Sequence, residues 1–554
     1  MREIKFNRWT LGLAAVGLVS LASAAEAEDA GVAKTNQVAQ AATTNSPPTT
    51  PSGTVIGAKA HEGFWKRYDE AVREQLGTPA YSEPAPPVPG VPAPPSTRRG
   101  LPAPFDSPPY PNGEWQIGGT EIIGDPNLTP DYPIMQALYQ GPHGQAWSDT
   151  GIKFYGWEDF SGNVSSSTHE GLNPVTAQAA NFPLVYDQRP NRIEQNQLVL
   201  YAERTPDENQ KDHADWGFRL SQVYGLDYRY MISRGWNDRQ LTEKNNFYGT
   251  DNPMMYFNLY LPHVAEGLNL TFGRIISEAD IEAQLAPNNL MSSHSLLYGF
   301  DPYCQWGLFA TLKLDDRWTI QGGIAAGNDV TPWELQDPGT QPTGTVMLQY
   351  QSPNGKFGFY GGGNAINNAQ WGFNNIQQYV GTFTYKFSDK IWTTHESWYM
   401  YMEGCPGQPS TTHPNGVAAP DEPKGQNPNI YGGNVGAFGF SDAQIPVHPG
   451  YAAEWATLNY TMFRLGPGTF LSIRNELFDD IDGNRTGYAT LYSEHSIGLT
   501  WWPSKLITIR PELRYDRSYG THGSSTDIVD ESKPFDNGSR RQQFTAQFDV
   551  IYHF

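Results

Sequence analysis

Charged side chains of both signs recur at every second position in the C-terminal part of the chain. The clearest cases are the run from Thr508 to Asp516 and the shorter run from Ser472 to Glu476. Alternate residues of a β-strand point to the same side, so the charges of each run would project into one space. Two kinds of chemistry fit such a space: ion pairs that link neighbouring strands, and an electric field that orients solutes in a watery channel. The residues concerned are Arg474, Glu476, Arg510, Glu512, Arg514 and Asp516, together with Arg219 and Arg274 on earlier strands.

No pattern for catalysis or for a bound cofactor accompanies these charges. His395 and Glu396 are adjacent, so in a strand they point to opposite sides. His61 and Glu62 lack the second histidine of a zinc-binding helix, and we find no nucleophile motif or phosphate-binding loop. The net charge of -21 argues against nucleic acid as a partner, because phosphates require a basic surface. We therefore expect neither an enzyme nor a cofactor.

The elements that would position these charges are strands, and the last stretch of the chain is the most informative one. From Gln543 to Phe554 an apolar and a mostly polar face alternate, and the chain stops on an aromatic residue. A closing strand of an outer-membrane β-barrel has this pattern, with lipid on one side and a watery lumen on the other. The apolar face, which we expect the barrel assembly machinery to recognise, includes Phe548, Val550, Tyr552 and Phe554.

Residues 150–554 contain about sixteen runs of strand type, and the lengths of their connections alternate. Tight turns such as Asp315-Asp316 and Gly466-Pro467 alternate with long connections such as 276–302 and 403–451. Short turns at one rim and long loops at the other are typical of an outer-membrane barrel. The sequence therefore predicts an all-β fold, a transmembrane antiparallel barrel of about sixteen strands in the bacterial outer membrane.

The two cysteines, Cys304 and Cys405, both fall beside predicted long loops, at the same rim of the barrel. Export to an oxidising compartment makes one disulfide across the mouth an expectation. Two unpaired thiols are the alternative.

The N-terminal part differs from the rest in composition. Residues 1–27 have the basic start, the apolar run and the small-residue cleavage sites of a signal peptide. Residues 28–110 are a low-complexity, Pro-rich arm that we expect to be disordered and periplasmic, apart from one short helix at about 61–76. Residues 111–149 connect this arm to the barrel.

Several stretches of the barrel region resemble the second β-barrel porin family, the OmpL-like proteins. They are Asn196 to Arg204, Trp216 to Arg219, Tyr224 to Asp227, Gly273-Arg274 with Glu282, Ser293-His294-Ser295, Gly307 to Leu314, Arg510 to Asp516, and Pro534-Phe535-Asp536. The resemblance spans about residues 150–554 and keeps the order of the motifs. It implies a porin-like outer-membrane barrel and leaves the solute undefined.

The leading hypothesis is passive diffusion of small hydrophilic solutes or ions, and the alternative is a non-conducting barrel that serves anchorage or adhesion. For the channel, we expect the loop Ser277 to Asp301 to fold into the lumen as a constriction; a lid outside the barrel is the equally weighted alternative. The acidic residues of that loop are Glu278, Asp280 and Glu282, and they would face arginines on the wall. Expected partners are outer-membrane lipid, the assembly machinery, small solutes and further copies of the chain.

Overall fold

The computed structural model describes the barrel region and part of the N-terminal arm. The described residues are Pro48, Thr50, 53–79, 131–171, 179–276 without 243 and 245, 280–407 without 354, 355 and 389, 410–412 and 446–554. The predicted signal peptide, most of the arm and Glu278 lie outside them.

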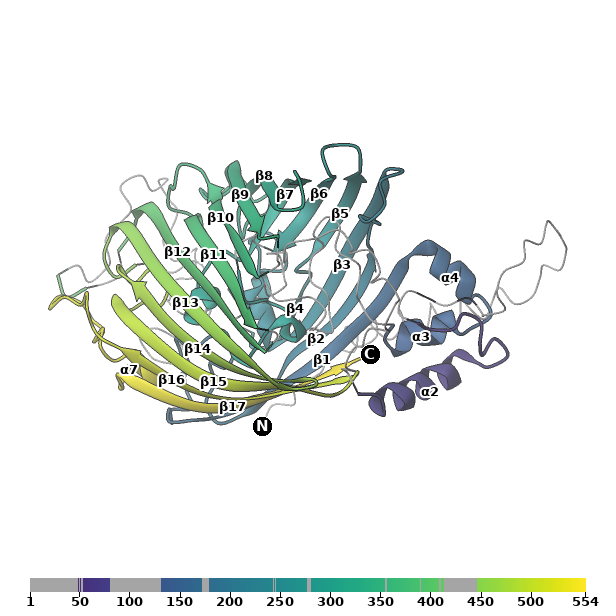
Figure 1. Cartoon of the computed structure of the whole chain (residues 1–554). Coiled ribbons are helices and arrows are strands. Elements are labelled where there is room, and N and C mark those ends of the chain that lie inside the picture. The colour runs from purple at the N-terminus through teal and green to yellow at the C-terminus, as the bar shows by residue number, and fades with distance from the viewer. Residues whose placement is uncertain are drawn as a thin grey trace.

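Seventeen strands in one antiparallel sheet are the main secondary structure of the described residues (Figure 1). Their bounds are β1 Ile152–Ser165, β2 Ile193–Arg204, β3 Asp215–Gly225, β4 Gly249–Asp251, β5 Met255–Leu261, β6 Leu268–Ile276, β7 Cys304–Lys313, β8 Trp318–Asn328, β9 Thr343–Gln351, β10 Phe357–Ile366, β11 Gln377–Ser388, β12 Ile391–Cys405, β13 Gly450–Gly466, β14 Thr469–Asp480, β15 Thr490–Ser504, β16 Ile507–Ser518 and β17 Gln542–His553.

The sheet is closed, because β1 pairs with β2 on one side and with β17 on the other. The short strand β4 and the strand β5 both pair with β3, at residues 223–225 and 215–220, so they share one place in the wall. The 17 described strands therefore occupy sixteen positions, and the predicted sixteen-stranded antiparallel barrel is confirmed. The sequence did not indicate β4, which is only three residues long.

The alternation of connection lengths follows the predicted pattern. Residues 314–317, 467–468 and 505–506 are tight turns at one end of the barrel, whereas the long connections that follow β6 and β12 start at the other end. In outer-membrane barrels the short turns face the periplasm. By this rule β17 ends at the periplasmic rim.

The outer surface of the barrel is apolar over most strands, as expected where lipid replaces water. Phe272, Ile324 and Val346 are 67%, 67% and 65% exposed, and they occupy alternate positions of their strands. Residues at the other alternate positions of these strands point inward; Thr345, which precedes Val346, is buried.

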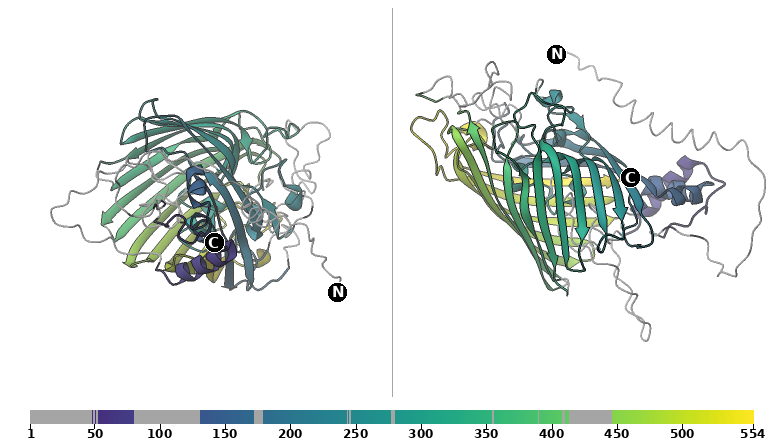
Figure 2. Two further views of the ribbon diagram at one scale, coloured as in Figure 1. Left: turned by 90° about the vertical axis from the view of Figure 1, so that its right-hand side faces the viewer. Right: turned by 90° about the horizontal axis from the view of Figure 1, so that it is seen from above.

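A small helical unit lies at the end of the barrel where the chain terminates (Figures 1 and 2). It consists of α2 (Phe64–Leu76), α3 (Pro133–Tyr139) and α4 (Gly144–Thr150). The helix α2 follows Gly63 and ends at Gly77, and it lies inside the range expected for the short helix of the arm. None of the described helices is long and apolar enough to cross a membrane.

The helical unit contacts the periplasmic rim through the ring of Tyr132 and the carbonyl of Thr78. Tyr132 is fully buried and stacks on His553, with ring centroids 5.3 Å apart. The carbonyl of Thr78 accepts a hydrogen bond of 3.1 Å from the backbone N–H of Lys505 in the last tight turn. This part of the predicted arm is therefore docked on the barrel and is more than a spacer.

Within the described parts of the long connections lie five further short helices. They are η2 Leu226–Tyr230, α5 Arg239–Thr242, η3 Ala286–Asn288, α6 Leu296–Gly299 and α7 Phe535–Gly538. Two of them, η3 and α6, belong to the connection between β6 and β7.

Candidate functional site

The described part of the connection between β6 and β7, residues 280–303, is named the inner loop because it lies inside the barrel. Three of its groups bond to inward-facing residues of β14, β15 and β16. The backbone N–H of Leu296 donates to Glu476 (2.8 Å), the hydroxyl of Ser293 donates to Glu512 (2.7 Å), and the carbonyl of Leu290 accepts from Thr500 (2.6 Å). The loop therefore lies inside the barrel, as expected, and the alternative of a lid outside is wrong.

Local hydrogen bonds shape the inner loop before it meets the wall. The hydroxyl of Ser295 caps α6 by accepting from the N–H of Tyr298 (3.1 Å), and the same hydroxyl donates to Glu282 (2.7 Å). Asn289 accepts a hydrogen bond of 2.8 Å from the N–H of Ala283. The two arms of the loop are thus tied together, which makes it a compact insert with few loose backbone groups.

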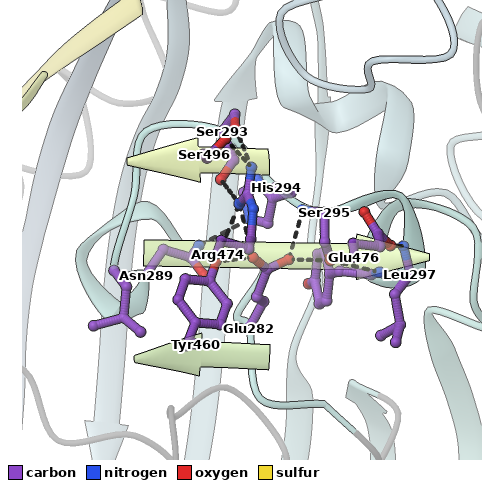
Figure 3. A network of polar contacts seen from close by, with 12 residues as sticks. Glu282, Asn289, Ser293, His294, Ser295, Leu297, Tyr460, Arg474, Glu476 and Ser496 are labelled. Atoms are coloured by element: carbon purple, nitrogen blue, oxygen red, sulfur yellow. Dashed lines mark hydrogen bonds and ion pairs between the residues drawn. The ribbon is translucent and has the colours of Figure 1, made fainter. Parts of the chain in front are cut away.

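Arg474 on β14 is the centre of the contact between loop and wall (Figure 3). Its guanidinium lies 3.0 Å from Glu282 of the inner loop, 3.0 Å from Glu494 and 3.2 Å from Glu512. It also donates to the carbonyl of Ser293 (2.8 Å), and its side chain is 0% exposed. One guanidinium therefore joins β15, β16 and the inner loop.

The two arginines of β16 repeat this arrangement. Arg510 forms an ion pair with Asp549 of β17 and donates to the carbonyls of Ala286 (2.6 Å) and Asn289 (2.7 Å). Arg514 lies 2.8 Å from Asp516 and donates to Ser293. The predicted alternation places these residues, together with Glu476 and Glu512, on the inward face of one wall.

The other two predicted arginines lie outside this cluster. Arg219 pairs with Glu203 on the neighbouring strand β2 (2.7 Å). Arg274 is on β6 and shares the alternation of the exposed Phe272. Its guanidinium lies 2.8 Å from Asp251 of β4, and its backbone pairs with Met255 of β5 and Trp306 of β7. Arg274 therefore belongs to the wall itself rather than to the pore lining that was predicted.

The acidic start of the inner loop is buried. Asp280 is hydrogen-bonded to Asp301 and Glu396, and its burial is the main cause that raises its pKa to about 7. Glu396 on β12 accepts a hydrogen bond of 2.8 Å from the N–H of Ile281. The acids of this loop thus hold it in place and do not face the wall arginines across an open gap.

The predicted disulfide is wrong, because Cys304 and Cys405 are both free and buried. Cys304 lies at the start of β7 and accepts a hydrogen bond from Arg274 (3.4 Å), whereas Cys405 is at the end of β12, opposite Gly450. Five strand spacings of about 4.8 Å separate β7 from β12, far beyond the limit of about 7 Å between bridged Cα atoms.

Sequence reasoning missed the partners of the arginines rather than the arginines. Glu494 follows Ser493 in β15, a strand whose polar and apolar positions are mixed, so its direction was not assigned. The sequence identifies Ser293 and Ser295 only as part of a motif. The usable signal was their position in an expected inner loop, because hydroxyls there can accept from arginine and donate to carboxylates.

Among the described residues, no group of three or more His, Cys, Asp and Glu side chains could hold a metal ion. The arrangement instead resembles the inside of a channel, with a loop fixed against one charged wall.

Comparisons with solved structures gave porins. The structural neighbours include the anion-selective porin from Comamonas acidovorans, with 9% identity and a TM-score of 0.41, matching 73% of this chain and 99% of that one. A second is the outer membrane channel DcaP of Acinetobacter baumannii, with 10% identity and a TM-score of 0.40, matching 73% and 97%. A third is the trimer form of OmpT from Vibrio cholerae, with 8% identity and a TM-score of 0.38, matching 73% and 99%.

Among curated proteins, none matches the chain significantly. The assignment rests on the sequence match of residues 159–554 to one family, which covers nearly the whole barrel. That match agrees with the resemblance noted in the motifs and with the closed barrel and its inner loop. The chain is thus an outer-membrane β-barrel protein and belongs to the family described as putative beta-barrel porin-2, OmpL-like.

Proposed function

We propose that this porin is a narrow diffusion channel for small hydrophilic solutes, whose width is set by the inner loop. The observation that carries the proposal is the attachment of residues 280–303 to the inside of the wall through Arg474, Arg510 and Arg514. A loop fixed in this way narrows a sixteen-stranded barrel, which otherwise encloses more room than side chains can fill.

The charges of the attachment favour cations among the solutes. Three guanidinium groups stand with six carboxyl groups in the same cluster: Glu282, Glu476, Glu494, Glu512, Asp516 and Asp549. Such an excess of acid near a constriction lowers the energy of a cation that passes it. The net charge of -21 for the whole chain has the same sign.

The test is the conductance of the purified protein in planar bilayers, with the reversal potential measured in a salt gradient. We expect small conductance steps with cation preference. A matched variant, Arg474→Gln, removes the guanidinium that joins the inner loop to the wall and should enlarge the steps. Steps of unchanged size would exclude the inner loop as the element that sets the width.

A non-conducting barrel for anchorage or adhesion is the second candidate, and a specific observation favours it. The inward groups around Arg474 are almost fully buried, and Tyr132 of the helical unit is buried at the periplasmic rim. Absence of steps from the wild type at high protein load, together with steps from the Arg474→Gln variant, would support this closed state.

We also propose roles for the segments of the whole chain. Residues 1–27 would direct export, 28–110 with the connection 111–149 would lie in the periplasm, and residues 150–554 would be inserted by the assembly machinery. N-terminal sequencing of the purified protein identifies its first residue and so tests the predicted cleavage site.

A further inference from the structure

The outward face of four neighbouring strands, β12 to β15, carries an unusual set of polar side chains. We name this set the polar patch; its members are Thr393, His395, Ser397, Thr457, Asn459, Thr461, Asn475 and His495. In the sheet they stand opposite one another: Thr393 faces Thr461, Ser397 faces Thr457, and Asn475 faces His495. The strands lie side by side in the wall (Figure 1).

The direction of the polar patch follows from the residues between its members. Glu396 and Tyr460 bond to the inner loop, so they point into the barrel. Their neighbours along the strands, His395, Ser397 and Asn459, must then point outward. The inward face of the same strands is partly apolar, with Trp398, Leu458 and Met462 buried. The usual distribution of polar and apolar residues is therefore reversed here.

The polar patch also lies at the depth of the hydrocarbon layer. Along β12 its members stand between Ile391 and Tyr399, and along β13 between Phe463 and Trp455. Tyr399 and Trp455 at one end and Phe463 at the other are aromatic, as is typical of the two interfaces of a barrel with water, so the patch lies between these interfaces.

Within the polar patch the side chains bond to one another. Ser397 lies 2.9 Å from His395 and 2.8 Å from Thr457, and Asn459 donates to Thr393 (3.0 Å). Asn459 uses both amide donors, to Thr393 and to the carbonyl of Thr394 (3.1 Å), and Thr393 donates to the carbonyl of Tyr460 (2.9 Å). Each hydroxyl and amide oxygen can accept a further bond, so these bonds leave acceptor capacity on the outside. Lipid chains cannot fill that capacity, and unfilled polar groups are costly in hydrocarbon.

The opposite wall shows what the lipid-facing zone looks like elsewhere. Phe257 and Leu259 on β5, Phe272 on β6 and Leu308 on β7 are all exposed and apolar. The strand β5 lies eight of the sixteen positions away from β13, half-way around the barrel. The polar patch is therefore a local feature of one side.

We propose that the polar patch is the contact surface for a second copy of this chain within the membrane. At this depth the neighbours of a barrel are lipid chains or another barrel, and only a barrel can present hydrogen-bonding groups. The patch members are hydroxyl, amide and imidazole groups, which are both donors and acceptors, so the same patch on another copy is complementary to it.

Cross-linking of the full chain in its native membrane tests the proposal. A cysteine at Thr457→Cys is treated with a short bis-maleimide before any detergent is added; Phe257→Cys on the opposite wall is the matched control. The native cysteines are fully buried and should not react. We expect a product of two joined copies from position 457 and none from position 257.

Three outcomes would overturn it: no product at position 457, equal products at both positions, or a product at 457 that contains a different protein.

A second measurement does not depend on cross-linking. The triple variant Thr457→Val, Asn459→Leu, Thr461→Val makes the patch apolar, which lipid tolerates, so the barrel should still fold. Folding is checked by the shift in gel mobility on heating. Sedimentation in detergent should then show single copies, whereas the wild type and Phe257→Leu remain associated. Persistent association of the triple variant would contradict the proposal. If it fails to fold, Thr457→Val alone, the smallest of these changes, should still weaken association.

Discussion

In two walls of this barrel the buried inward polar side chains find their hydrogen-bond partners in different ways. The inward side chains of the charged wall, β14 to β17, include the arginines and carboxylates around Arg474, whereas those of the amide wall, β5 to β9, are mainly asparagine, glutamine and threonine. In the amide wall the groups bond to one another across neighbouring strands, as Gln349 does to Gln321 (2.8 Å) and Asn258 to Thr271 (2.9 Å). In the charged wall the groups bond to the inner loop.

This difference explains why the inner loop lies against the charged wall. An amide is satisfied by another amide, so the amide wall needs no further partner. A carboxylate that is removed from water needs several donors, and the backbone N–H groups of Ser293, Leu296 and Leu297 supply them to Glu512 and Glu476. The charged wall therefore selects the inner loop as its partner and fixes it on one side of the lumen.

The largest effect is expected from Arg474→Gln. This change leaves Glu282, Glu494 and Glu512 buried without their shared cation, and breaking a buried pair typically costs about 3 to 5 kcal/mol. The free energy of barrel unfolding, measured with urea in detergent, should fall by this amount. If it falls by less than about 1 kcal/mol, the charged wall would not depend on the network and its contrast with the amide wall would disappear.

The next effect concerns the seam between β1 and β17. The backbone of Phe554 exchanges two hydrogen bonds of 3.0 Å with Gly156, and its ring occupies the space beside that glycine. Phe554→Asp should therefore lower the amount of folded barrel in the outer membrane more than Phe544→Asp, at the other end of the same face of β17. We would measure both by the heat-dependent gel shift of membrane fractions. Equal yields would show that the terminal ring has no special part in closing the barrel.

A pH effect is expected from the inner loop. The pKa of Asp280 is raised to about 7, so the folded protein holds a proton that the unfolded chain loses near pH 4. The contribution of this group to the free energy of unfolding therefore falls as the pH rises from about 4 to about 7. Above about pH 7 it stays constant. Asp280→Asn keeps the neutral form. Relative to the wild type, it should be more stable at pH 8 and close to equal below pH 4. A constant difference at all pH values would contradict this assignment.

The smallest effect is expected from the amide wall. Replacing both Gln321 and Gln349 by Leu removes both partners of one hydrogen bond, a change that is often nearly neutral and within about 1 kcal/mol. Urea unfolding measures it under the conditions used for Arg474→Gln. A loss of unfolding free energy comparable to that of Arg474→Gln would show that both walls depend equally on their polar side chains.

The fold could be predicted from the sequence because its signal is local and repeated. The alternation of Ile507, Ile509 and Leu513 with Thr508, Arg510 and Glu512 assigns both faces of β16 without any knowledge of its neighbours. The turns and loops then fix the order of strands. The strand β12 could not be assigned in this way, since it carries polar residues outward and Trp398 and Met400 inward. Its faces are set by the inner loop inside and, on our proposal, by another copy outside.

The site was predicted less well, for reasons of distance along the chain. Arg474 and Glu282 are far apart in sequence, and only the folded loop brings them within 3.0 Å. Arg274 shares the alternation of the exposed Phe272 and pairs with Asp251 of β4, a strand that no residue pattern indicated. The disulfide was predicted only because both cysteines lie at the same rim of the barrel. That reasoning did not include the number of strands between them, which keeps both thiols free.

The contacts of Tyr132 have a consequence for the order of events in folding. Its ring lies against Tyr155 of β1 (6.3 Å between centroids) and His553 of β17 (5.3 Å), the first and last strands of the barrel. The surface on which Tyr132 rests is therefore created only when these two strands pair. Docking of the helical unit must come after that step, and resistance of residues 53–79 to added protease would mark the moment at which a newly inserted barrel is complete.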